Sequence, residues 1–170
     1  MAWIKMIKAP LLPTMPPFTI SDFTASNGSV YSGSYSGPVI ENNSLTNYIT
    51  SWAWGNQYEL FLDYNYPLNV SGVNTLHIEG HRTILSSTDK GYAVINLDLQ
   101  YSSDGITYTA LDRIELTGWN WNDNLTQSYS TNIDISSYNY IKIKFRYFQM
   151  TSDQNSNKQV KYCLDGVTFI

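Results

Sequence analysis

Charged residues are scarce in this sequence. Asp, Glu, Lys and Arg make up 14% of the 170 residues, against about 25% in typical soluble domains. The ten Lys and Arg residues are dispersed, and the net charge is −4. Because nucleic acids are bound through clustered cations, we expect no nucleic-acid partner. Ser, Thr, Asn and 14 Tyr supply the polar surface instead, which suits sugars and protein interfaces.

Cysteine and long apolar runs are also scarce, and the first residues do not have the pattern of a secretory signal. Cys163 is the single cysteine, so no internal disulfide forms, and we expect a small buried residue rather than a reactive thiol. No apolar run approaches the roughly 18 to 20 residues of a membrane span, so we predict no membrane insertion. Lys5, Lys8 and Pro10 interrupt the apolar N-terminus, which predicts that there is no signal peptide.

Proline is concentrated at the start of the chain, with four of the six prolines in residues 1–17. Proline fixes φ and donates no hydrogen bond, so this segment is predicted to be extended. The segment is also rich in large apolar residues, which a solvated tail does not need. We predict that residues 1–17 form an arm that packs either on its own domain or on a neighbouring subunit. The apolar residues assigned to this arm are Trp3, Ile4, Ile7, Leu11 and Leu12.

A helical period is absent, and from residue 18 onward the apolar residues recur with a period of two. Residues 93–100 and 141–148 alternate apolar with mostly polar side chains, and 59–63 and 76–79 are shorter copies. Turn signals such as Asp104-Gly105 separate the runs. The pattern predicts one all-β domain over residues 18–170, a two-sheet antiparallel β-sandwich of about nine or ten strands.

The last predicted strand changes parity. Val160, Tyr162 and Leu164 share one face, whereas Val167 and Phe169 have the opposite parity. A β-bulge at residues 165–166 would bring both groups to the same side, so we predict a bulge there.

Two segments together resemble the galactose-binding-like jelly rolls, the superfamily of discoidin-type domains and many carbohydrate-binding modules. Residues 99–111 are similar to the family's strand, Ser-x-Asp-Gly hairpin and aromatic-bearing strand, and residues 133–169 look like its closing strands. The resemblance implies a jelly-roll sandwich. It also implies a structural calcium held by Asp165, which matches a carboxylate of the family's last strand. The alternative is that Asp165 bonds backbone at the bulge, and no cofactor is required.

A polar loop at residues 118–124 is the best candidate binding surface. Sugar recognition combines aromatic rings, which contact C–H groups, with planar amides, which bind hydroxyls. The same loop would serve as a protein-interface hot spot, or its tryptophans would fold back onto the sandwich. The residues assigned to binding are Trp119, Asn120, Trp121, Asn122 and Asp123.

A second aromatic pair, Trp52 and Trp54, lies on a strand predicted over residues 47–54 and is a further candidate for ligand binding. Tyr48 and Thr50 share the predicted face of these tryptophans, and small residues alternate with them. Large rings on one face are typical of a core, so we interpret this face as core-facing, with an aromatic platform as the alternative.

Catalytic and metal-binding signals are weak. His77, Glu79 and His81 would share one strand face, a conceivable metal site, although Gly80 is expected to break the alternation. Residues 33–37 resemble a nucleophile elbow, but their central residue is Tyr35 rather than serine. With no acid/base cluster in view, we expect no enzyme.

Two functions fit this sequence. The first is a non-catalytic virion structural or assembly protein, of the phage tail, neck, fibre or head-decoration type, with glycan- or receptor-binding capacity. Its arm would join other virion subunits or a second copy, and the protein would be made in the host cytoplasm and reach the virion. The second function is a stand-alone, extracellular carbohydrate-binding module or lectin, which the resemblance and the 118–124 loop favour.

Overall fold

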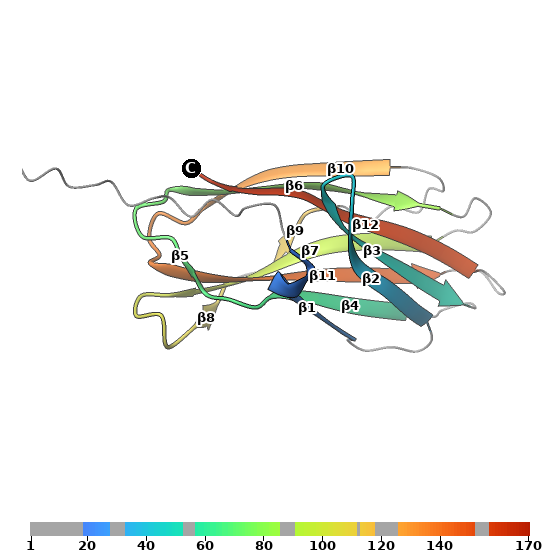
Figure 1. Cartoon of the computed structure of the whole chain (residues 1–170), viewed down its shortest axis with the longest axis horizontal. Helices are drawn as coiled ribbons and strands as arrows, with labels where there is room; N and C mark the ends of the chain where they lie inside the picture. Colours follow the sequence, from blue (N-terminus) through green and yellow to red (C-terminus); the bar gives the residue numbers. More distant parts are fainter. Residues whose placement is uncertain are drawn as a thin grey trace, which may run out of the picture.

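The period-two segments form two stacked antiparallel β-sheets (Figure 1). The computed structural model describes residues 19–27, 33–52, 57–85, 91–111, 113–117, 126–151 and 157–170. Within its strands, the side chains of residues 33, 51–52, 57, 91–92, 150–151 and 157–158 are not described. The prediction of an all-β, two-sheet antiparallel sandwich is confirmed.

Each sheet is named here after its central strand. The β11 sheet has the order β1 (Phe23–Asn27), β4 (Gln57–Tyr64), β11 (Tyr140–Thr151), β7 (Gly91–Ser102) and β8 (Thr109–Ala110). Two short strands join this sheet, β5 (Leu68–Asn69) on β11 and β9 (Ile114–Glu115) on β7. The β12 sheet has the order β10 (Thr126–Asp134), β6 (Thr75–Ile84), β12 (Asn157–Phe169), β3 (Ser44–Trp52) and β2 (Gly33–Glu41). A 3-10 turn, η1 (Ile20–Asp22), precedes β1.

The connections between these strands define a jelly roll. The chain stays within one sheet from β2 to β3, from β4 to β5 and from β7 to β9, and it passes to the other sheet at every other connection. The resulting orders, β3-β12-β6-β10 and β4-β11-β7-β8, are those of two interlocked Greek keys. The resemblance to the galactose-binding-like jelly rolls is therefore confirmed at the level of the fold.

One hydrophobic core fills the space between the sheets. On β11, the side chains of Ile141, Ile143, Phe145 and Tyr147 are at most 2% exposed. Burial of each such side chain contributes about 1.5–3 kcal/mol relative to exposure. The predicted core faces of β4, β6 and β7 are confirmed in the same way, by the burial of Leu60, Leu62, Leu76, Ile78, Ala93, Ile95, Leu97 and Leu99. In β7 the opposite face is also buried at Val94 and Asn96, so the predicted alternation holds there only over residues 97–100.

The predicted change of register in β12 is also present. The pairing of β12 with β6 shifts between Leu164 and Gly166. As a result, Leu164 and Val167 both face the core despite their opposite parity. Asp165, the residue between the two registers, lies on the exposed side of the sheet.

The expectation that Gly80 breaks the alternation of β6 is wrong. β6 alternates without interruption over residues 75–84, so His77, Glu79 and His81 share the outer face. Gly80 instead leaves room for Tyr129 of β10, because a Cβ at this position would clash with the Tyr129 hydroxyl and the Cys163 carbonyl.

The residues around Gly80 are held tightly. The Tyr129 hydroxyl donates a hydrogen bond to the Cys163 carbonyl at 3.0 Å, and Tyr129 is buried. Cys163 is buried as expected, and burial raises the pKa of its thiol. The glycine is therefore a packing requirement of this corner of the core.

The interpretation of the Tyr48 face of β3 as core-facing is wrong. Leu45 and Ile49, which are fully buried, point into the core, so Tyr48 points outward and is only half-buried. The Tyr48 hydroxyl donates to the Glu41 carboxylate at 2.7 Å. A tyrosine with a polar partner is well placed on an outer face, so ring size did not predict burial here.

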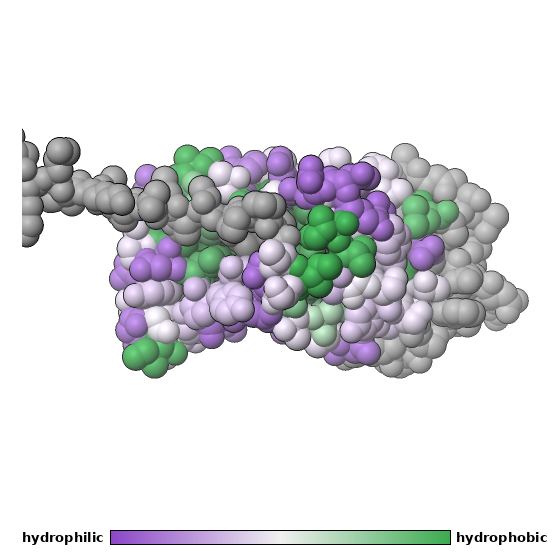
Figure 2. Space-filling model, viewed as in Figure 1, coloured by the Kyte–Doolittle hydropathy of each residue, from purple (hydrophilic) through white to green (hydrophobic). Residues whose placement is uncertain are grey.

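On the face drawn in Figure 2, the described surface is largely hydrophilic or intermediate, with one compact apolar patch near the middle and smaller apolar groups elsewhere. Among the described residues, no helix has the length and apolar character needed to span a membrane. The large apolar side chains exposed on this surface are Ile20, Val39, Ile40, Tyr66, Leu85, Ile106 and Ile170.

We expect the change Gly80→Ala to lower the free energy of unfolding by about 1–3 kcal/mol, because the added methyl group forces Tyr129 away from β6. Thermal unfolding followed by circular dichroism measures the change. Tyr129→Ala is the matched control: the loss of the ring makes room for the methyl group. Gly80→Ala should therefore cost less in the Tyr129→Ala background than alone. An equal cost in both backgrounds would contradict the assigned role of Gly80 as space for the Tyr129 ring and would leave the Cys163 carbonyl as the group that the methyl group meets.

Candidate functional site

The outer face of β11 carries three cations in a row. Lys142, Lys144 and Arg146 alternate with the buried residues of the same strand, so all three point away from the core. Because β11 lies between β4 and β7, these cations occupy the middle of an exposed sheet face. In the register of the sheet, Lys144 lies between Asp63 and Asp98, and Lys142 lies beside Gln100.

Acidic neighbours neutralise two of these cations. Lys144 Nζ lies 3.5 Å from Asp63 Oδ2. Arg146 pairs with Glu59, and both side chains are largely buried. Such pairs fix the direction of long side chains that would otherwise be mobile.

A fourth cation enters from the segment before β9. Arg113 donates two parallel hydrogen bonds to Asp98, from Nε to Oδ1 at 2.6 Å and from Nη2 to Oδ2 at 2.9 Å. The hydrogen bond with Asp98 raises the pKa of Arg113. Bidentate pairs of this kind are strong and geometrically specific, so Arg113 and Asp98 form one rigid planar unit.

Each cation of β11 also lies over an aromatic ring. Lys144 Nζ is 4.5 Å from the centre of the Phe61 ring, and Arg146 Cζ is 4.9 Å from that of Phe148. Lys142 Nζ is 4.0 Å from the centre of the Tyr108 ring. At exposed sites such contacts contribute about 0.5–1 kcal/mol each. They order the three cations before any ligand arrives.

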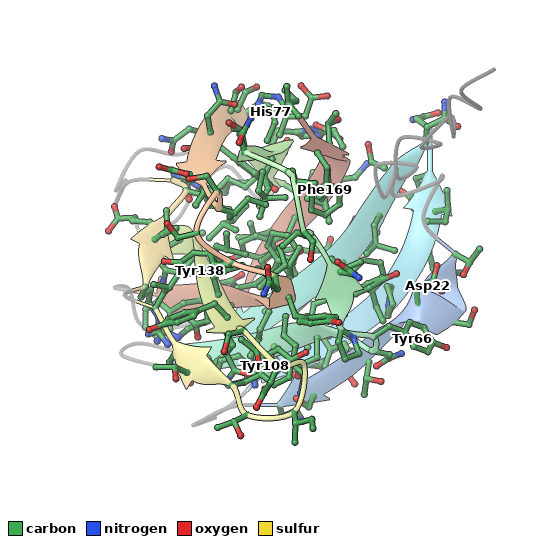
Figure 3. The ribbon with its side chains drawn as sticks, turned by 90° about the vertical axis from the view of Figure 1, so that its left-hand side faces the viewer. Asp22, Tyr66, His77, Tyr108, Tyr138 and Phe169 are labelled. Carbon is green, nitrogen blue, oxygen red and sulfur yellow. The ribbon has the colours of Figure 1, made fainter. Side chains whose placement is uncertain are left out.

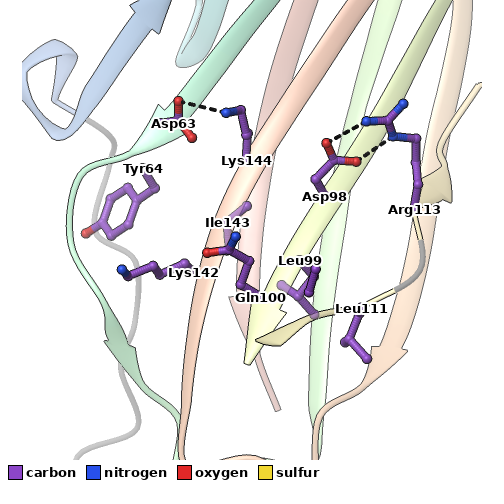
Figure 4. A pocket seen from close by; sticks show the side chains of 11 residues that line it. Asp63, Tyr64, Asp98, Leu99, Gln100, Leu111, Arg113, Lys142, Ile143 and Lys144 are labelled. Carbon is purple, nitrogen blue, oxygen red and sulfur yellow. Dashed lines mark hydrogen bonds and ion pairs between the residues drawn. The ribbon is translucent and has the colours of Figure 1, made fainter. Parts of the chain in front are cut away.

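A groove with a volume of about 500 Å³ lies over this face, and we call it the β11 groove (Figure 4). Strands β4, β11 and β7 contribute to it, together with Ala110, Leu111 and Arg113. Its volume is within the range of small-ligand sites. The residues that line the groove are Asp63, Tyr64, Asp98, Leu99, Gln100, Ala110, Leu111, Arg113, Lys142, Ile143 and Lys144.

The turn after β7 leads to the ring beneath Lys142. Asp104 accepts hydrogen bonds from the backbone N–H groups of Ile106 and Thr107 at 2.8 and 2.9 Å and from the Ser102 hydroxyl at 2.8 Å. These hydrogen bonds lower the pKa of Asp104 to about 2. Tyr108 follows directly, so the turn sets the position of its ring.

Aromatic residues cluster at this end of the sandwich. Figure 3 shows Tyr108 and Tyr138 there, on the side of β7 and β8. Tyr138 stacks on Tyr101 with ring centres 4.5 Å apart. A smaller cavity of about 250 Å³ lies between this stack and the turn. The stacked rings and the turn that leads to Tyr108 therefore line opposite sides of one small cavity.

Most residues that the sequence analysis assigned to sites lie outside the described residues. The binding loop and the arm are among them, as are Trp54 and the side chain of Trp52. Their assignments stay predictions. The residues concerned in the loop and arm are Trp119, Asn120, Trp121, Asn122, Asp123, Trp3, Ile4, Ile7, Leu11 and Leu12.

Asp165 is described, and its carboxylate is bound by side chains. It accepts a hydrogen bond from the Ser44 hydroxyl, and His81 Nδ1 lies 2.8 Å from its other oxygen. Calcium takes about six to eight oxygen ligands. Within the described part of the chain, no group of three or more His, Cys, Asp or Glu residues is placed to hold a metal ion. Calcium at Asp165 stays a prediction. In the structure, the neighbour of the second Asp165 oxygen is the His81 ring nitrogen.

Comparisons with known proteins leave the family open. No family model matches the sequence, and no curated protein matches it.

Three solved structures are similar to this chain. The enzymatically active domain of tailspike protein 4 of bacteriophage CBA120 has a TM-score of 0.49 and 9% identity, over 89% of this chain and 20% of that chain. TmCBM61 in complex with beta-1,4-galactotriose has a TM-score of 0.42 and 10% identity, over 89% and 90%. A structure of infectious bursal disease virus, Gt strain, has a TM-score of 0.43 and 10% identity, over 86% and 31%.

These likenesses are distant. This chain spans about a fifth of the tailspike chain and about a third of the virus chain. The assignment to the jelly-roll class rests on the strand order described above.

The β11 groove was not predicted from the sequence. The alternation of Lys142, Lys144 and Arg146 with buried residues was visible, but it is the ordinary pattern of a half-solvated strand. The positions of Asp63 and Asp98 beside those cations depend on the pairing of strands far apart in the chain. Without knowledge of that pairing, a groove with ordered side chains cannot be told from an ordinary solvated face.

We expect Asp104→Asn to lower the stability of the protein at neutral pH and to have a smaller effect in acid. The pKa of Asp104 falls from 3.8 to about 2 on folding. Its ionised form therefore stabilises the fold above about pH 4, and this contribution is lost as the pH falls through about 2. Urea unfolding of both proteins at several pH values measures the difference. A difference that stays constant down to about pH 2 would contradict the assigned role of Asp104.

Proposed function

We propose that this protein is a non-catalytic jelly-roll module that binds a carbohydrate in the β11 groove. The proposal rests on the groove itself. It is an open site of about 500 Å³ in which ion pairs hold polar side chains in place over a rigid sheet. A sugar hydroxyl both donates and accepts hydrogen bonds. The Arg113–Asp98 unit offers both functions side by side, and so does the Gln100 amide.

Apolar contacts suited to a sugar are also present. Tyr64, Ala110 and Leu111 line the groove beside the charged groups. Pyranose rings present C–H groups on one side and hydroxyls at the rim, so a mixed lining of this kind supports carbohydrate binding. Because the polar groups are already ordered, binding costs little additional side-chain entropy.

The state of the two carboxylates favours binding over catalysis. Glycoside hydrolysis needs one carboxyl group that stays protonated near neutral pH and a second that is ionised. In the β11 groove, Asp98 accepts two hydrogen bonds from Arg113, and Asp63 lies beside Lys144. Each carboxylate is thus already paired with a cation of the protein itself, an arrangement that suits a binding site better than a pair of free catalytic carboxyl groups.

The finer biological role stays a prediction. A virion assembly protein that joins other subunits or its own copies through residues 1–17 and is located in the virion is compatible with a glycan-binding groove. A stand-alone extracellular carbohydrate-binding module is equally compatible.

The test is a glycan array followed by calorimetry on the best ligand. We expect Arg113→Ala to weaken binding by about 10-fold to 100-fold, because it removes a charged donor and releases Asp98. Gln100→Ala should weaken binding by about 5-fold. Lys161→Ala is the matched control, since this cation lies on the β12 sheet and pairs with Glu41.

The predicted loop provides the competing outcome. If Trp119→Ala and Trp121→Ala abolish binding while Arg113→Ala and Gln100→Ala leave it intact, the ligand binds at residues 118–124. That result would refute the β11 groove as the site.

A further inference from the structure

We infer that the ligand of the β11 groove is an acidic glycan whose carboxylate, such as that of a uronic acid, binds Lys142 and Gln100. This inference rests on the proposed function and adds the class of sugar. It follows from the charge balance of the groove and from the surroundings of Lys142.

The charges that line the groove do not cancel. Three cations, Lys142, Lys144 and Arg113, face two carboxylates, Asp63 and Asp98. Lys144 and Arg113 each have an acidic partner. The described residues that line the groove therefore carry one net positive charge, in a protein whose net charge is −4.

Lys142 is the source of this excess charge. Among the described residues it has no acidic partner, and its Nζ lies 4.0 Å from the centre of the Tyr108 ring. An aromatic ring attracts a cation without neutralising it. The ammonium group is thus held in position while its hydrogen-bond donors remain available to a ligand.

The neighbour of Lys142 suits a carboxylate. Gln100 is its register partner on β7, and both side chains line the same groove (Figure 4). One carboxylate oxygen can accept a hydrogen bond from the Lys142 ammonium, and the other from the Gln100 amide. The hydroxyls of the same sugar would then reach Asp98 and Arg113.

A neutral sugar would bind less well at this position. It would take water away from the Lys142 ammonium without supplying a counter-charge, and partial burial of an unpaired charge is costly. The groove should therefore discriminate by charge as well as by shape.

The test compares ligands that differ only in the acidic group. Oligogalacturonides and oligoglucuronides are measured by calorimetry against their carboxyl-reduced counterparts, which have the same backbone but are neutral. We expect the acidic form to bind at least about 10-fold more tightly, with affinity falling as salt increases. A sulfated neutral oligosaccharide is included, and tighter binding of sulfate than of carboxylate would overturn the assignment to a uronic acid.

Variants of Lys142 connect the preference to the structure. Lys142→Met keeps an unbranched side chain of similar length but removes the charge. The ratio of the affinity for the acidic ligand to that for the neutral ligand should therefore fall to near one. Lys142→Arg should retain most of the preference. Lys161→Met, on the opposite sheet, should leave the ratio unchanged.

The outcomes separate the two proposals. If no glycan binds, acidic or neutral, both the function and the inference are overturned. If neutral glycans bind as tightly as acidic ones and Gln100→Ala still weakens them, the groove is a carbohydrate site and only the charge preference is wrong.

Discussion

The alternation of β11 between buried and exposed side chains constrains both the core and the candidate site. Ile141, Ile143 and Phe145 fill the space between the sheets, and Lys142 and Lys144 stand on the opposite face. A slip of one residue in the pairing of β11 would place cations in the core and apolar side chains in water. The core therefore fixes the register, and the register brings the cations beside Asp63 and Asp98.

The jelly-roll connectivity makes this constraint non-local. β11 pairs with β4 and β7, and β12 pairs with β3 and β6, so the last two strands each insert between earlier ones. In β12 the bulge between Leu164 and Gly166 lets both halves of a long strand face the core. It also leaves Asp165 on the outer face, where Ser44 and His81 bind it.

Local patterns predicted the elements well, and long-range contacts limited the rest. The sandwich, the buried residues of β4, β6, β7 and β11, and the bulge followed from parity alone. Parity does not say which face of a strand turns inward when both are mixed, so Tyr48 was assigned to the wrong side. Nor does it reveal that Gly80 faces the Tyr129 ring, a contact made across two strands.

The candidate site was harder to predict for the same reason. The roles of Arg113, Asp98 and Tyr108 depend on partners that lie elsewhere in the chain. The neighbouring sequence contains no motif that predicts these roles. Aromatic residues in a polar loop drew the prediction to residues 118–124 instead. The β11 groove has a different character, in which rings order cations rather than forming an exposed platform.

A nuclear magnetic resonance titration of isotope-labelled protein with the best glycan from the array tests the central claim most directly. If the ligand occupies the β11 groove, the largest shifts will fall on Gln100, Lys142 and Lys144 and on the Arg113 side chain, with little change on the outer face of the β12 sheet. Shifts confined to residues 118–124, with β11 unaffected, would contradict the account.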